Sequence, residues 1–137
     1  MKFLGTEIGK VTKMTESALK IIGDACAESG ADIRLSPKKP GYYIGCAGTD
    51  TDAQVIYLNT RTATGQELIR ISCGIIIGVG TGSLTMVDSD ADDASFTYRF
   101  PKNPRTDDTE PARTLAKLKS DLPEIGKVLR MIAACQK

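Results

Sequence analysis

Apolar and polar residues alternate along three segments in the second half of the chain, at about 53–60, 67–79 and 95–101. A period of two is typical of β-strands that bury one face and leave the other in water. The polar linker at 61–66 joins the first two segments and suits a hairpin. The pattern therefore predicts an antiparallel sheet with one apolar and one polar face.

A helical apolar spacing precedes these strands. It predicts a helix over 15–29, with Thr15 as the capping residue and Gly30 as the stop. The apolar stripe of this helix comprises Met14, Ala18, Ile21, Ile22, Ala25 and Cys26.

Two further helices are predicted after the strands, at about 108–120 and 121–136. Each has a proline in its first turn, where a missing N–H costs nothing. These are Pro111 and Pro123. In the second helix, Asp121 is followed three residues later by a glutamate, which is a variant of the capping box. The apolar stripe of that helix comprises Leu122, Ile125, Val128, Leu129 and Ile132.

Shorter segments complete an α+β fold. The pattern over residues 1–12 predicts either a small hairpin or an extended arm. Short strands are expected at 31–37, at 41–47 and within 83–87. We expect an antiparallel sheet of about five strands, with an N-terminal helix and two C-terminal helices packed on one face. The single domain, 1–137, comprises an arm and helix (1–40), the sheet (41–101) and the C-terminal helix pair (108–136).

Composition limits the chemistry. The chain has 137 residues, 41% of them hydrophobic, a net charge of +1 and no histidine, which removes the usual general base, metal ligand and pH switch. Paired carboxylates occur only in loops and at helix starts, where capping explains them. We therefore predict no enzyme activity, no cofactor and no metal site. An enzyme that uses Lys, Asp or Tyr alone is the remaining alternative.

Two loop segments match ligand-binding motifs only in part. The glycine-rich run at 78–83 lacks the lysine of a phosphate-binding loop, so we interpret it as a plain loop. Asp88, Asp90 and Asp92 have the spacing of a calcium loop, but the required glycine and glutamate are missing. A solvated loop is expected there, with a cation site as the alternative.

The four cysteines, Cys26, Cys46, Cys73 and Cys135, include no C-x-x-C pair. The chain begins without an apolar signal run, and no stretch approaches the length of a membrane span. We therefore expect a cytoplasmic product with reduced thiols and no membrane partner.

The polar sheet face is the main functional signal. It carries arginines and hydroxyls with almost no acid, which suits phosphates and bases. An ordinary solvated sheet face is the alternative. Val55 and Leu68 are apolar members of this face by alternation. The candidate binding residues on this face are Tyr57, Asn59, Arg61, Arg70, Ser72, Ser95, Thr97 and Arg99.

From residue 41 to the end, the order and lengths of the elements resemble those of the coat proteins of single-stranded RNA bacteriophages. The similarity lies in pattern and spacing. It is carried by the strand "GYYIGC", the unit "AQVIYLNTRTATGQELIRISCGIII", the long loop to "SFTYRFP", and the helix pair "PARTLAKLKSDLPEIGKVLRMI".

The resemblance implies that two copies pair edge to edge into one continuous sheet. The helices of each copy would lie across the partner's sheet on the outside, and the opposite face would bind the RNA genome and an RNA hairpin that represses translation. By strand position, the resemblance makes the eight candidate residues above, from Tyr57 to Arg99, the predicted RNA-binding residues. Many dimers would form an icosahedral virion shell, assembled in the host cytoplasm. The loop at 78–93 would meet its copies around the symmetry axes.

The chain departs from the family at its start. The family usually opens with a β-hairpin, whereas 15–29 predicts a helix. Cys73 and Cys135 lie outside the loop where some relatives form disulfides, so no covalent cross-links are expected. The alternative function is a small non-enzymatic phage-encoded protein that inhibits a host protein, with the sheet face or the glycine-rich loop as its docking surface.

Overall fold

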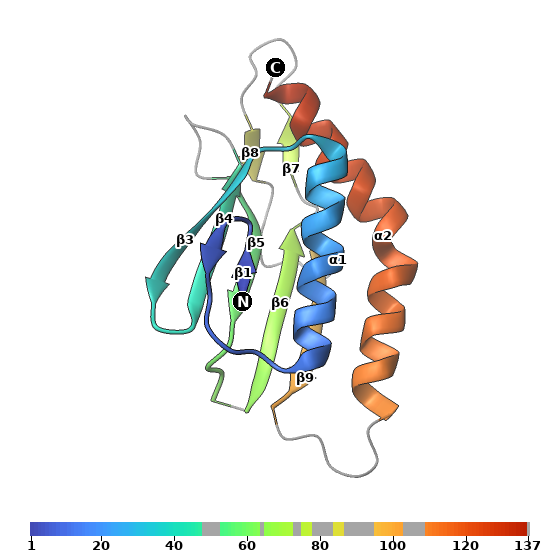
Figure 1. The fold of residues 1–137 in the computed structure, drawn as a ribbon. Coiled ribbons are helices and arrows are strands. Elements are labelled where there is room, and N and C mark those ends of the chain that lie inside the picture. Colours follow the sequence, from blue (N-terminus) through green and yellow to red (C-terminus); the bar gives the residue numbers. More distant parts are fainter. Residues whose placement is uncertain are drawn as a thin grey trace.

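The computed structural model shows an α+β fold with one five-stranded antiparallel sheet (Figure 1). The structure describes residues 1–47, 53–63, 65–72, 75–77, 84–86, 95–102 and 109–136. The elements are β1 (Lys2–Phe3), β2 (Thr6–Glu7), α1 (Lys13–Ser29), β3 (Ile33–Lys39), β4 (Tyr42–Ala47), β5 (Ala53–Asn59), β6 (Gln66–Ser72), β7 (Ile75–Ile77), β8 (Leu84–Met86), β9 (Ser95–Pro101) and α2 (Thr109–Cys135).

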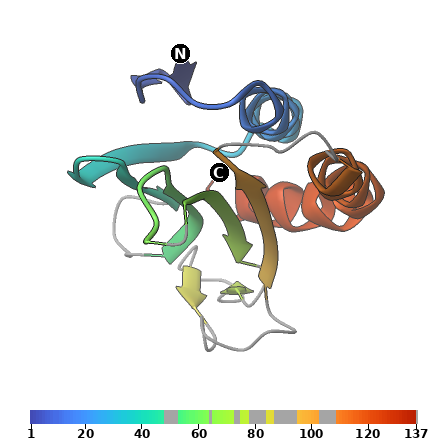
Figure 2. The same cartoon turned by 90° about the horizontal axis from the view of Figure 1, so that it is seen from below.

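The sheet has the strand order β3-β4-β5-β6-β9. Figure 2 shows α1 and the β1–β2 hairpin on one face of the sheet, which we call the inner face, and β7 and β8 beyond the opposite, outer face. α2 packs beside α1 and against β9. The predicted fold class is confirmed for the five-stranded sheet, the N-terminal helix and a C-terminal helix. The sheet begins at Ile33, earlier than the predicted boundary at 41.

The core lies between the inner face and the helices. Alternate residues of β5, β6 and β9 point into the core. Each helix contributes the apolar residues along one of its sides. Burial of such side chains is the main favourable term in folding. The largest fully buried side chains are Tyr98, Phe100, Leu19, Ile22, Ile56, Leu58, Ile69, Ile71, Leu118, Ile125, Leu129 and Ile132.

The N-terminal segment forms the small hairpin rather than the extended arm. Leu4 and Gly5 make its two-residue turn, with φ of 51° and 80°. Positive φ at both central positions gives the backbone twist that tight hairpins favour. The hairpin is anchored because Phe3 is only 2% exposed and belongs to the core.

The start of α1 differs from the prediction. Thr12 is the N-cap, and its side chain accepts a hydrogen bond from the backbone N–H of Thr15. Thr15 is fully buried and donates its hydroxyl to Glu67 on β6 at 2.7 Å. The Glu67 carboxylate also accepts from the Thr12 N–H at 3.0 Å. Thr15 therefore links the helix to the sheet and does not cap it. The predicted stop is confirmed, because Gly30 is left-handed, with φ of 77°.

The predicted pair of C-terminal helices is wrong, because α2 is continuous through Pro123 and bends along its length (Figures 1 and 2). Proline within a helix removes one hydrogen bond and favours a kink. The helix continues because Leu118 before the proline and Ile125 after it are both fully buried in one core. Asp121, the predicted cap, instead accepts a hydrogen bond from the Tyr98 hydroxyl at 2.7 Å.

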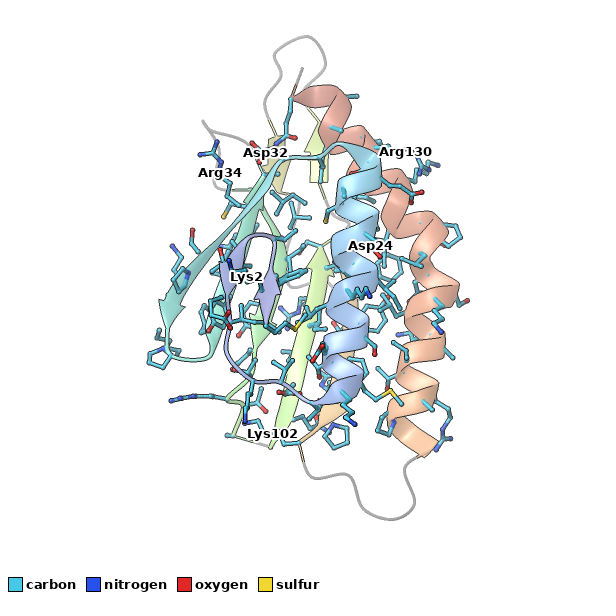
Figure 3. The ribbon with its side chains drawn as sticks, in the orientation of Figure 1. Lys2, Asp24, Asp32, Arg34, Lys102 and Arg130 are labelled. Atoms are coloured by element: carbon cyan, nitrogen blue, oxygen red, sulfur yellow. The ribbon has the colours of Figure 1, made fainter. Side chains whose placement is uncertain are left out.

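The end of α2 is tied to the start of β3. The Gln136 side chain accepts from the backbone N–H of Asp32 and donates to its carbonyl, both at 2.8 Å. Asp32 lies near the last turns of α2 in Figure 3. These two hydrogen bonds join the end of α2 to the start of the sheet.

The predicted long strand at 67–79 is two strands. β6 pairs with β5 and β9 in the main sheet, whereas β7 pairs with β8 in a separate two-stranded sheet. The short strand expected within 83–87 is thus confirmed. The glycine-rich run at 78–83 lies outside the described residues, as do Asp88, Asp90, Asp92 and Cys73.

A β-bulge corrects the position of Val55. Gly45 pairs with Ile56 and Cys46 pairs with Gln54, so Val55 is an additional residue on β5. A bulge interrupts the alternation of side chains. Val55 is fully buried in the core and does not lie on the polar face as alternation predicted.

Candidate nucleic-acid interface

The register of the sheet aligns the predicted residues in rows across the outer face. Tyr57 pairs with Arg70, which pairs with Thr97. Directly opposed residues on neighbouring strands have close side chains on the same face. A second row comprises Asn59, Leu68 and Arg99, and a third pairs Ser72 with Ser95.

The predicted residues differ in how accessible they are. Arg99 is exposed and Ser72 is buried. Tyr57, Asn59, Arg70 and Thr97 are half-buried, which leaves part of each side chain open to a ligand. Ser95 is placed by its backbone pairing alone.

Arg61 lies apart from the rows. It follows the end of β5, is exposed, and lines a pocket at the end of the sheet. Alternation along the sequence had assigned it to the face, but the strand ends at Asn59 and the alternation ends with it.

The outer face extends onto β3 and β4, which the sequence analysis did not assign to the site. Tyr42 pairs with Asn59 and its ring meets the ring of Tyr57 edge to face, with centroids 4.9 Å apart. Lys39 Nζ lies 5.4 Å from the centre of the Tyr42 ring, and Arg70 Cζ lies 5.4 Å from that of Tyr57. These four residues form one row of cation, ring, ring and cation, which we call the aromatic row.

The aromatic row is held by its own contacts. Cation–ring attraction and edge-to-face ring packing both fix the orientation of the tyrosines. Desolvation, together with the neighbouring Tyr57 hydroxyl, raises the pKa of Tyr42. The Tyr42 phenol therefore stays protonated over the whole neutral range and remains a hydrogen-bond donor.

One signal in the sequence points to Tyr42. The strand at 41–47 contains two adjacent tyrosines, so one of them must lie on each face of the sheet. The inner member is Tyr43, whose hydroxyl donates to the Ile8 carbonyl at 3.3 Å. Tyr42 is left for the outer face.

The outer face is positive in the part of the chain that the structure describes. No Asp or Glu side chain in β3 to β6 or β9 lies on it, because Glu67 points to the inner face. Its cations are Lys39, Arg70 and Arg99, with Arg34 toward one end, where Asp32 lies 3.7 Å from it (Figure 3). Strands that present cations and no carboxylate on this face, with Arg70 half-buried and the other cations exposed, suit an anionic ligand.

Apolar residues interrupt the polar rows. Leu68 lies between Asn59 and Arg99 and is half-buried. Ile44 pairs with Tyr57 and is 6% exposed, although it is not part of the core cluster on the inner face. Ile44 is thus closed to a ligand, and Leu68 offers a small apolar surface beside the rings and cations.

Other kinds of site are not found among the described residues. No group of three or more cysteine or acidic side chains is arranged to hold a metal ion. Of the helices described, neither is both long and apolar enough to cross a membrane. Cys26 is buried, Cys46 is half-buried, and both are thiols.

Comparisons with known proteins add nothing to this geometry. No protein-family model, no curated protein and no solved structure matches the chain.

Proposed function

We propose that this chain is a structural virion coat protein that pairs with a second copy, self-assembles into an icosahedral shell and packages single-stranded RNA. The observation that carries the proposal is the outer face. It combines cations, half-buried aromatic rings and hydrogen-bonding side chains across five strands, none of which presents a described carboxylate on this face.

The rows together supply three kinds of RNA contact. Arg70 and Arg99 are placed to bind phosphates, since guanidinium groups match phosphate oxygens with paired hydrogen bonds. Tyr57 offers a ring on which an unpaired base can stack, and single-stranded RNA exposes such bases. Asn59 and Thr97 can hydrogen-bond base edges or 2′-hydroxyls, as repression through an RNA hairpin requires.

Pairing with a second copy can use an end strand of the sheet. The end strands are β3 and β9, and no other described strand pairs with the free side of either. An open edge is a template for strand addition. α1 and α2 cover the chain's own sheet, so this route needs no exchange of helices between copies. Edge pairing would join two outer faces into one continuous surface.

Sedimentation of untagged protein from a bacterial lysate tests the proposal. A coat protein is expected to sediment as very large particles that absorb strongly at the nucleic-acid maximum. A small oligomer without nucleic acid would overturn the proposal and favour the alternative, a small phage-encoded binding protein that acts on a host protein. Treatment with ribonuclease before lysis of the particles checks that the nucleic acid is enclosed.

A further inference from the structure

We propose that a second site, at the end of the sheet and apart from the outer face, binds a small phosphate-bearing anion. The site is a pocket of about 440 Å³ lined by the end of the β1–β2 hairpin, the β3–β4 turn and the segments after β5 and β9. Ligand pockets have volumes of about 300–1,000 Å³. Figure 3 shows Lys102, which lines it, at the lower end of the sheet.

Three cations from distant parts of the sequence meet at this pocket. They are Lys10, Arg61 and Lys102, and no ion pair within the described part of the chain involves any of them. Like charges gathered around one space repel each other, and an anion bound between them removes that repulsion. The three cations therefore favour an anionic occupant.

Glu7, the only carboxylate among the described lining residues, is already engaged. Glu7 Oε1 accepts from the Gly9 N–H at 3.0 Å and lies 2.8 Å from the amino group of Met1. These two contacts lower the pKa of Glu7 and direct its charge toward the hairpin backbone. Glu7 is thus a poor partner for the three cations.

Arg61 is positioned by a glycine. A Cβ added to Gly41 would lie 2.5 Å from Arg61 Cγ and 2.9 Å from Cδ. The arginine stem therefore crosses directly over the β3–β4 turn, where Gly41 has φ of 79°. A larger residue at this position would displace the stem and with it the guanidinium.

The lining selects the class of ligand. One guanidinium with two ammonium groups matches a tetrahedral oxyanion of two or more charges better than a single carboxylate. Glycine, proline and threonine make up much of the remaining wall, so there is little apolar surface for a bulky group. Phosphate, pyrophosphate and the phosphate of a small ester share the required chemistry.

This pocket is separate from the proposed RNA surface. Its hairpin residues and Tyr43 belong to the inner face, whereas Arg70 and Arg99 lie on the outer face. The inference therefore does not depend on the proposed function.

Isothermal titration of the purified full-length protein with pyrophosphate tests the site. We expect saturable binding of pyrophosphate by the wild type. The double variant Lys10→Met with Lys102→Met should bind more weakly, with a loss in affinity of about tenfold for each cation removed. Gly41→Ala should weaken binding while both lysines remain. Parallel titrations with inorganic phosphate and a nucleoside monophosphate show whether a free phosphate or an ester is preferred.

The control is Lys119→Met with Lys127→Met, which removes two exposed cations of α2. Absence of saturable binding by the wild type, or equal weakening in this control, would overturn the site. RNA binding should be unchanged in the pocket variant. Conversely, Arg70→Ala with Arg99→Ala should lose RNA binding and keep pyrophosphate binding, so the two proposals fail separately.

Discussion

The two faces of the sheet come from the same strands but differ in what their side chains contact. On the inner face, Ile69, Tyr98 and Phe100 are fully buried beneath the helices. On the outer face, Arg70 and Thr97 are half-buried and Arg99 is exposed. Successive side chains of a strand point to opposite faces of the sheet. Residues that stabilise the core therefore alternate along each strand with residues that are open to a ligand.

Replacing Phe100 on the inner face should have the largest effect. Phe100→Ala is expected to lower the free energy of unfolding by about 3–5 kcal/mol, because it leaves a cavity in a fully buried site. Denaturant unfolding measures this loss. Phe96→Ala, on the same strand but only partly buried, is the matched control and should cost less. Equal losses would contradict the assignment of Phe100 to the core.

Replacing Glu67, the buried carboxylate on the inner face, should have the second largest effect. Glu67 is 3% exposed and accepts two hydrogen bonds from the start of α1. Glu67→Ala is expected to cost about 2–3 kcal/mol, because buried donors lose their acceptor. Glu67→Gln retains a carbonyl acceptor and should cost less in the same unfolding experiment. If both variants unfold like the wild type, the link between helix and sheet is not formed.

On the outer face, removing cations should change binding and leave stability intact. Arg70→Ala with Arg99→Ala is expected to keep the wild-type unfolding midpoint but to weaken RNA binding. The log–log salt dependence should flatten by about 0.7 for each lost contact with a single strand. Lys119→Ala with Lys127→Ala on α2 is the control. An unchanged slope would remove the RNA-binding proposal.

The smallest effect concerns the Cys26 thiol. Burial raises the pKa of Cys26 to about 11, so its reactive thiolate is scarce at pH 8. Mass spectrometry after brief alkylation should find Cys26 unmodified in the native protein and modified after unfolding. The raised pKa favours the folded state below the ordinary thiol value near 9, and this contribution is lost as the pH rises toward 11. Rapid native labelling of Cys26 would contradict its burial.

Much of this architecture follows from local patterns in the sequence. Alternation predicts that Tyr57, Arg70 and Thr97 lie on the polar face, because each is flanked in its strand by residues that point to the opposite face. The stop of α1 at Gly30 and the short strand at 84–86 follow from equally local signals. These predictions needed no knowledge of distant contacts.

The errors have tertiary causes. Pro123 lies within one helix because the core on both sides of it favours continuity over the lost hydrogen bond. Thr15 does not cap the helix because its hydroxyl donates to the Glu67 carboxylate on β6. A bulge in β5 places Val55 on the inner face. The contribution of Tyr42 depends on the pairing of β4 with β5. None of these contacts is visible in a single segment.

The strand order has a consequence for how the chain folds. β3, β4, β5 and β6 are neighbours both in the sheet and in the sequence, so this meander can close through short loops as it leaves the ribosome. β9 must return across residues 73–94 before it reaches β6, and α2 follows it. We therefore expect the last strand to dock late, which leaves the β6 edge of the nascent chain unpaired until β9 arrives.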